Sequence, residues 1–184
     1  IQWSASPWDL DSLDFLNQYD LPFIKIPSAL LTDLELIKKA TETGKKIIIS
    51  TGMSTLDEVD SAVNTIKEVN NNADFAVLHC NSSYPSAPDE MNLNAIKNLQ
   101  NQFNIPVGLS DHTLGLFVSH TAIVLGANAI ERHFTLDRTL EGPDHILSSE
   151  PAEMRQLVNN TYSLPNMLGD GVKRIQPSEY NTIN

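Results

Sequence analysis

Two histidines close consecutive hydrophobic runs in this sequence, and their spacing suits the binding of a metal ion. His112 follows the run 107–109, and His133 ends the run 129–133. Neighbouring strands of a sheet lie ~4.8 Å apart, so two imidazoles at adjacent strand ends can share one cation. Neutral imidazole is a common ligand of divalent transition metals, and Asp111 could orient His112 or instead cap the following helix. Hydrogen-bonded histidines that bind no metal are the alternative interpretation.

A lysine and a series of small polar residues suit the binding of an anion. Lys25 lies within the otherwise apolar run 23–26, where its charge is costly unless it meets a phosphate or a carboxylate. Gly52 allows close approach of the backbone. Hydroxyl and amide donors follow the same runs: Ser28, Ser50, Thr51, Asn81, Ser82, Ser83 and Ser110. Such a ring of donors suits an oxyanion, phosphate above all. A lysine that extends to solvent from an edge strand is the alternative.

Two carboxylates are candidates for contact with a substrate. Side chains alternate along a strand, so Glu131 and His133 share one face, while Arg132 points outward or into a salt bridge. The turn 142–145 could place Asp144 over the site as an acid, a base or a ligand of a sugar hydroxyl. A purely structural turn is the alternative.

Six hydrophobic runs, each followed by an amphipathic stretch, predict six β-α units. We expect strands at 1–6, 23–26, 47–50, 75–79, 106–109 and 129–133. Helices are expected near 10–16, 32–43, 55–70, 92–103 and 116–125, and from Pro151 onward. Thr32 with Glu35, and Thr55 with Glu58, have the spacing of capping boxes.

The hydrophobic runs are continuously apolar, which is typical of parallel strands covered on both faces. Six units do not close an eight-stranded barrel, so either the sheet is open and doubly wound or two units are missing. The abrupt start of the sequence favours the second. We therefore predict an α/β fold, a parallel (β/α)8 TIM-type barrel that is incomplete here, with its chemistry at the carboxyl ends of the strands. The predicted catalytic domain spans 1–168, and 169–184 is a linker.

Composition narrows the range of functions. The 184 residues carry a net charge of −11, which argues against a nucleic-acid or anionic-membrane surface. No run approaches the ~18 apolar residues of a membrane-spanning helix. Cys80 is the one cysteine, which excludes an internal disulfide, fits a reducing and therefore cytoplasmic location, and is expected to be structural. Motifs for nucleotide triphosphates, dinucleotides and serine hydrolysis are lacking.

Several motifs occur together and in order, and they are far more specific as a set than singly. They are 50–53 (STGM), 79–85 (HCNSSYP), 108–113 (GLSDHT), 131–138 (ERHFTLDR), 142–145 (GPDH) and 150–151 (EP). The sequence resembles the sialic acid synthase family, which includes the legionaminic and pseudaminic acid synthases. The resemblance implies condensation of phosphoenolpyruvate with an N-acylated amino sugar such as N-acetylmannosamine. The product would be a nine-carbon 2-keto acid used in surface glycans, and phosphate would be released.

The resemblance also assigns roles to residues. His112 and His133 would ligate a divalent metal, typically manganese, with magnesium or cobalt as alternatives, that polarises the sugar aldehyde. The phosphate and carboxylate of phosphoenolpyruvate would be held by Lys25, Ser28, Ser50, Asn81 and Ser110. Asp144 would contact sugar hydroxyls, and Tyr84 and Glu131 would line the same cavity. Family members are homodimers in which an antifreeze-like domain reaches into the partner's site.

Departures from the family pattern limit what this stretch is expected to do alone. The first two barrel strands, with an early glutamate and a second anion-binding lysine, and the antifreeze-like domain are not in the sequence. Where many members have Ser-Thr-Pro-Phe-Asp, the stretch 5–9 reads Ala-Ser-Pro-Trp-Asp and keeps a hydroxyl at Ser6. We expect these residues alone to be inactive. A metal-free aldolase that forms a Schiff base through Lys25, and a non-catalytic sugar- or anion-binding paralogue, are the alternatives.

Overall fold

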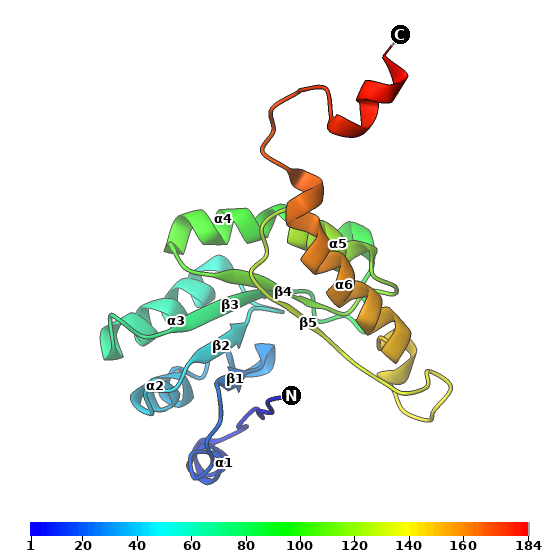
Figure 1. Ribbon diagram of the computed structural model, residues 1–184. Coiled ribbons are helices and arrows are strands. Elements are labelled where there is room, and N and C mark those ends of the chain that lie inside the picture. The colour runs from blue at the N-terminus through cyan, green and yellow to red at the C-terminus, as the bar shows by residue number, and fades with distance from the viewer. Residues whose placement is uncertain (184) are drawn as a thin grey trace.

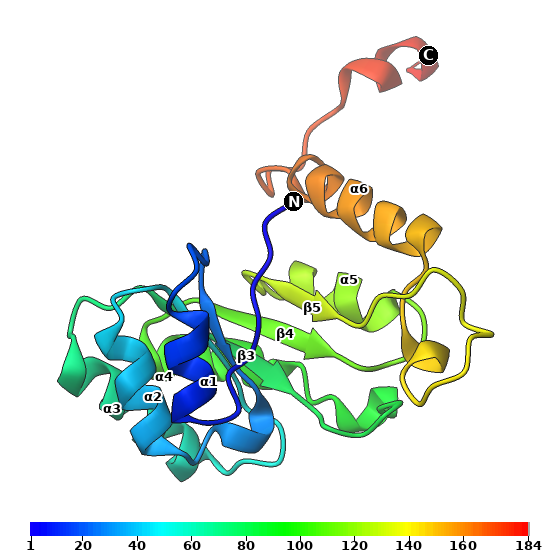
Figure 2. The same cartoon turned by 90° about the horizontal axis from the view of Figure 1, so that it is seen from below.

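Five parallel strands form the sheet of the computed structural model, which describes residues 1–183. Their order in the sheet is their order in the chain: β1 (Ile24–Ile26), β2 (Ile47–Ser50), β3 (Phe75–Cys80), β4 (Val107–Asp111) and β5 (Ile130–Arg132). The sheet curls into a half-barrel with helices along its outer side (Figures 1 and 2). Because all strands run in one direction, their carboxyl ends meet at one rim. The predicted α/β class and the incomplete TIM-type barrel agree with this arrangement.

The expected sixth strand, at 1–6, does not form. Residues 1–7 pair with no strand, although the Ser4 hydroxyl donates to the carbonyl of Phe23 at 2.6 Å. Ile1 and Trp3 are exposed, so this segment buries too little apolar surface to hold it in a ladder. The structure therefore contains five β strands among the described residues, where the hydrophobic runs predict six.

Helices follow the strands where amphipathic periodicity predicts them. They are α1 (Leu10–Leu16), α2 (Leu34–Glu42), α3 (Leu56–Val69), α4 (Asn94–Phe103), α5 (Phe117–Val124) and α6 (Pro151–Leu168). The Thr55–Glu58 capping box forms at the start of α3. At α2 the carboxylate of Asp33, and not the predicted Thr32, accepts the capping bond, from the Leu36 amide at 3.0 Å. A negative charge at this position also complements the helix dipole.

The register of the strands decides which residues face the helices. Ile26 lies opposite Ile49, and the same row continues through Val77 and Val107. All four side chains are fully buried against the helices, together with Leu36, Ile37, Val59, Val63, Ile66 and Ile96. Because side chains alternate along each strand, the intervening residues face the inner side of the half-barrel. That inner side is where the polar residues of the strands collect.

The last residues leave the half-barrel. After α6 the chain is exposed and extends away from the sheet, with a short 3-10 turn at Pro177–Thr182 (Figure 1). The predicted division into a domain at 1–168 and a linker at 169–184 stays a prediction, and Asn184 lies outside the described residues. None of the helices within residues 1–183 combines the length and apolar character needed to span a bilayer.

Candidate active site

One cavity of about 480 Å³ opens at the carboxyl ends of the strands, and it gathers most of the predicted site residues. The predicted residues that line it are Lys25, Ser28, Ser50, Tyr84, Ser110, His112, Glu131 and His133. Strand register explains part of this set, because Ser110 in β4 lies directly opposite Glu131 in β5. Side chains in one row point to the same face of a sheet. The cavity is therefore a consequence of how the strands align.

Lys25 points into this cavity rather than out to solvent. Its side chain is 13% exposed, and its ammonium group donates to the Ser50 hydroxyl at 2.8 Å. The same nitrogen lies 3.4 Å from Oε2 of Glu131, whose Oε1 accepts from the Ser110 hydroxyl at 2.7 Å. One carboxylate thus neutralises the lysine while the adjoining side of the cavity stays open. This is the environment in which a buried cation can meet an anionic ligand.

Gly52 brings a second group of hydroxyls to the same wall. Its amide donates to the Ser28 hydroxyl oxygen at 2.9 Å. A Cβ atom at Gly52 would collide with the Ser82 hydroxyl and lie 2.9 Å from that of Ser28. The absence of a side chain therefore lets hydroxyls from separate loops approach each other. Thr51 turns away, since its hydroxyl donates to the Leu78 carbonyl at 3.2 Å.

Asn81 is the one predicted phosphoenolpyruvate-binding residue whose side chain is not brought to this cavity. Its amide oxygen accepts from the Ser83 backbone at 2.9 Å, which fixes it within its own turn. Its backbone carbonyl instead lies 2.8 Å from Nδ1 of His112. In this structure Asn81 contacts the site through its backbone, by orienting an imidazole.

The two histidines lie side by side, as predicted from their strand ends. Their ring centroids are 5.3 Å apart, and the Tyr84 ring stacks 4.2 Å from that of His112. Because Nδ1 of His112 donates to the Asn81 carbonyl, Nε2 is the ring nitrogen whose lone pair is available. His133 Nδ1 lies 3.7 Å from a carboxylate oxygen of Asp144. Asp144 therefore reaches the site through His133.

The donor chemistry of this pair fits a divalent transition metal with open coordination positions. Within residues 1–183, no group of three or more His, Cys, Asp and Glu side chains gathers for a metal ion. The described residues thus offer two imidazoles at this cavity.

Burial and hydrogen bonding shift the titration of these groups. Burial lowers the pKa of His133, which favours the neutral ring that a metal requires. Burial also acts to lower the pKa of His112, but hydrogen bonds with Cys80 and the Asn81 carbonyl outweigh this effect, and the pKa lies above its ordinary value. Conversely, burial acts to raise the pKa of Cys80, and its hydrogen bonds, above all with His112, bring it below the ordinary value. Burial raises the pKa of Tyr84, so its phenol stays a hydrogen-bond donor at neutral pH.

The Asp111 carboxylate forms its hydrogen bonds with groups other than the His112 ring, and it does not cap the next helix, although its position in the sequence suggested both roles. Its carboxylate accepts from the amide and the hydroxyl of Thr113 and from Arg132. The physical reason is that β4 continues to Asp111, so strand alternation turns this side chain to the outer face, away from the cavity. Arg132 forms the salt bridge that was its expected alternative to pointing outward.

Ser82, one of the predicted donors, and Ser6, whose hydroxyl keeps the family pattern, also line the cavity, whereas Trp8, Met53 and Cys80 were not predicted to bind ligand. Cys80 had a usable signal, because it stands in register with Ser110 and therefore on the inner face. Its neighbour His79 faces the other way and contacts the Met91 carbonyl at 2.7 Å. Met53 lies just after the end of β2 in a left-handed backbone conformation, which no pattern in the neighbouring sequence predicts.

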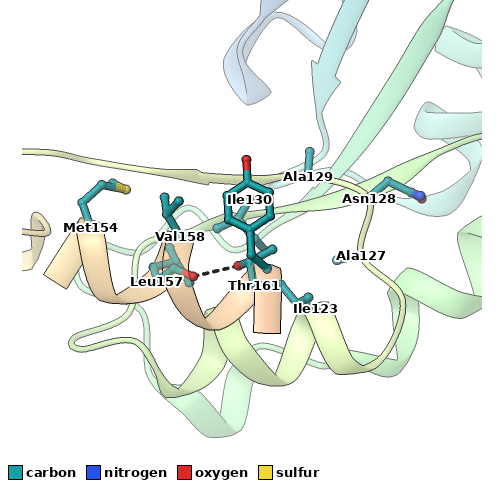
Figure 3. Close-up of a pocket in the computed structure, with 10 residues that line it drawn as sticks. Ile123, Ala127, Asn128, Ala129, Ile130, Met154, Leu157, Val158 and Thr161 are labelled. Carbon is teal, nitrogen blue, oxygen red and sulfur yellow. Dashed lines mark hydrogen bonds between the residues drawn. The ribbon is translucent and has the colours of Figure 1, made fainter. Parts of the chain in front are cut away.

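A separate hollow of about 320 Å³ lies between β5, α5 and α6 (Figure 3). Aliphatic residues such as Ile130, Leu157 and Val158 dominate its lining, which contains no acid, lysine, arginine or histidine. The Thr161 hydroxyl donates a hydrogen bond to the Leu157 carbonyl at 2.8 Å within α6. This hollow is therefore mainly apolar, in contrast to the cavity at the strand ends.

Comparison with known proteins gives one consistent result. The model of the NeuB family matches residues 1–173. The N,N'-diacetyllegionaminic acid synthase of Campylobacter jejuni is 42% identical over 185 residues, covering 100% of this chain and 55% of that protein. The N-acetylneuraminate-9-phosphate synthase of Homo sapiens is 36% identical, covering 97% of this chain and 50% of that protein. The chain thus spans about half the length of these curated relatives.

A solved structure agrees with the sequence matches. The N-acetylneuraminic acid synthetase of Leptospira borgpetersenii, in complex with citrate, superposes with a TM-score of 0.86 at 35% sequence identity. The match covers 97% of this chain and 62% of that one.

Proposed function

The chain belongs to the NeuB family of sialic-acid-type synthases, and from this premise we propose that the protein condenses phosphoenolpyruvate with an N-acylated amino sugar. An N-acetylmannosamine-like sugar would supply the aldehyde, and the product would be a nine-carbon 2-keto sugar acid. In this reaction C3 of phosphoenolpyruvate bonds to the aldehyde carbon, and a water oxygen adds at C2. The bond between C2 and the phosphate oxygen then breaks, and inorganic phosphate leaves.

One observation carries the proposal: a buried lysine with hydroxyl donors and a pair of imidazoles face the same cavity. Lys25 and the hydroxyls of Ser50 and Ser28 provide the chemistry that a phosphate and a carboxylate require. The anion and the sugar aldehyde would then lie within one cavity, which is the geometric requirement for a bond between them.

His112 and His133 are the residues that would hold a divalent metal, manganese in our proposal, with magnesium or cobalt as alternatives. When bound, such an ion supplies Lewis-acid polarisation of the aldehyde oxygen. The hydrogen bond to the Asn81 carbonyl orients the His112 ring so that Nε2 is free. Asp144 lies beside His133 and would accept a hydrogen bond from a sugar hydroxyl, and the Tyr84 phenol, whose ring packs on that of His133, would donate one.

Glu131 has a distinct part in this scheme. Its carboxylate is shared between Lys25 and Ser110, so it holds both donors in place before an anion arrives. An entering phosphate would compete with Glu131 for Lys25, which limits the affinity of the empty site for small anions.

The biological setting is proposed on the family alone. We place the reaction in the cytoplasm, in a homodimer, as a step that supplies sugar acids for surface glycans. We also keep the expectation that residues 1–184 alone are inactive.

The test is phosphate release by the full-length protein with phosphoenolpyruvate, manganese and a panel of N-acylated hexosamines, with and without EDTA. We expect sugar-dependent release that EDTA abolishes and manganese restores. His133→Gln should abolish release, whereas His120→Gln should preserve it, because His120 lies on α5, where its ring hydrogen-bonds with Asn160, and it is not part of the cavity lining. No release with any sugar would favour a binding module. Turnover that survives EDTA would favour a Schiff base on Lys25.

A further inference from the structure

A buried ion pair lies directly behind the two histidines. Asp111 and Arg132 are Cα partners in the β4–β5 ladder, and each immediately precedes a histidine, His112 or His133. Their side chains are 0% and 2% exposed and face away from the cavity, toward α5. The charged pair therefore occupies the position where the two histidine-bearing backbones run side by side.

Arg132 contacts the residues on both sides of His112. Its guanidinium donates to the Asp111 carboxylate and, at 2.8 Å, to the Thr113 carbonyl. Asp111 in turn accepts from the Thr113 amide at 2.9 Å and from its hydroxyl at 2.7 Å. Residues 111 and 113 are thus tied to one side chain of β5, and His112 stands between them.

The same guanidinium is linked to the backbone of the second histidine. Its Nε donates to the Ser149 hydroxyl at 2.9 Å, and the Ser149 amide donates to the His133 carbonyl at 2.8 Å. Ser119 on α5 donates to Asp111 as well, which fastens the pair to the covering helix. One planar donor group therefore connects the segments that carry both imidazoles.

We propose that Asp111 and Arg132 are positioning residues that fix the distance and orientation between His112 and His133 for a shared metal ion. This inference rests on the metal site of the proposed function. Removing the two charges of a buried pair from water costs free energy that apolar residues in the same place would not cost. The contribution of such a pair is therefore expected in the geometry that it fixes rather than in the stability of the fold. Arginine suits that role because its rigid fork directs several hydrogen bonds at once, and lysine cannot.

A purely structural pair would behave differently in a test. It would join β4 to β5, and its loss would lower the melting temperature without changing how a bound metal is coordinated. The two cases are separated by the visible absorption spectrum of Co²⁺, which reports ligand geometry, and by the affinity of the full-length protein for Co²⁺ and Mn²⁺.

The experiment compares Arg132→Lys with Arg138→Lys in the full-length apoprotein. Arg138 is a matched control, because it pairs with Glu153 and donates to the Ser148 carbonyl but contacts neither 111–113 nor 132–133. We expect Arg132→Lys to weaken metal affinity about 10- to 100-fold and to alter the Co²⁺ spectrum, as loss of an outer partner of a metal ligand does. Arg138→Lys should leave both unchanged while lowering the melting temperature. In turnover, kcat should fall in Arg132→Lys while the KM for phosphoenolpyruvate stays unchanged, since the Arg132 side chain is buried with Asp111, on the face opposite the cavity that Lys25 lines.

A milder variant keeps the test decisive if Arg132→Lys does not fold. Ser149→Ala removes one bond to Arg132 and leaves the backbone bonds of Ser149 intact, so it should weaken metal affinity in the same direction by a smaller factor. Wild-type affinity and spectrum in the folded variants would overturn the inference and leave the proposed function standing. Failure of the wild-type protein to bind either metal would overturn both.

Discussion

Substitution of Gly52 by alanine should damage anion binding far more than it damages the fold. A Cβ atom there would meet the hydroxyl oxygens of Ser82 and Ser28 and lie 3.1 Å from Sγ of Cys80. All three side chains line the cavity. Because the backbone of Gly52 is not left-handed, alanine brings no conformational strain, and the steric conflict is its whole effect. The conflict is relieved most easily by rotating the flexible hydroxyls out of place.

The expected size follows from the two displaced donors. Each hydrogen bond contributes about 0.5 to 1.5 kcal/mol, so the loss in phosphoenolpyruvate binding should be about 1 to 3 kcal/mol. At about 1.4 kcal/mol per tenfold, that is a rise in KM of about 5- to 150-fold. Steady-state phosphate release measures the KM, and urea unfolding measures stability.

Gly44→Ala is the control for this substitution. Gly44 follows the C-cap of α2 with a φ of 71° and has no atom within 4 Å of an added Cβ, so alanine there brings backbone strain without a collision. We expect it to cost about 1 to 2 kcal/mol of stability and to leave the KM for phosphoenolpyruvate unchanged. An unchanged KM in Gly52→Ala, or an equal rise in both variants, would refute the reasoning.

Three further predictions concern charge and capping. Lys25→Met should raise the KM for phosphoenolpyruvate about 10- to 150-fold, and Lys25→Arg should restore part of it in the same assay, whereas a Schiff-base enzyme would lose turnover in both. The hydrogen bond with Arg138 lowers the pKa of Glu153 below its ordinary 4.5, so its stabilisation is full above that pH and disappears as the pH falls through the lower folded value. Thermal melts of Glu153→Gln and wild type should therefore converge in acid; a constant difference would contradict this. Thr55→Ala removes the capping box with Glu58 and should cost about 1 kcal/mol in urea unfolding, and no loss would mean that solvent replaces the cap.

Much of this fold can be predicted from sequence because buried parallel strands are continuous apolar runs. The strands that formed are those whose alternate residues, such as Ile26, Ile49 and Val77, meet helices. The run at 1–6 also carries large apolar side chains, but Ile1 and Trp3 stay exposed, and Trp3 packs edge to face on Tyr19 rather than under a helix of the sheet. Hydrophobic pattern reports the capacity to be buried, whereas strand formation also needs neighbours.

The same distinction applies to side-chain roles. Alternation within β5 correctly separates Glu131 from Arg132, because both belong to the same short strand. Asp111 could not be assigned in this way, since its role depends on whether β4 ends before it or includes it. One additional strand residue moves the carboxylate from the cavity side to the buried outer face. Strand ends are set by tertiary contacts such as that with Arg132, which no local pattern contains.

Cys80 shows how far register could extend such reasoning. Once Glu131 is known to face inward, its ladder partner Ser110 must do so, and so must Cys80, the partner of Ser110. The inward-facing residues of one strand therefore identify those of the next strand, provided that the register between the two strands is known. The register depends on how the helices pack against each strand, which is tertiary information. Sequence thus contains the residues of this site, and the packing of the helices against the outer face determines which of them meet.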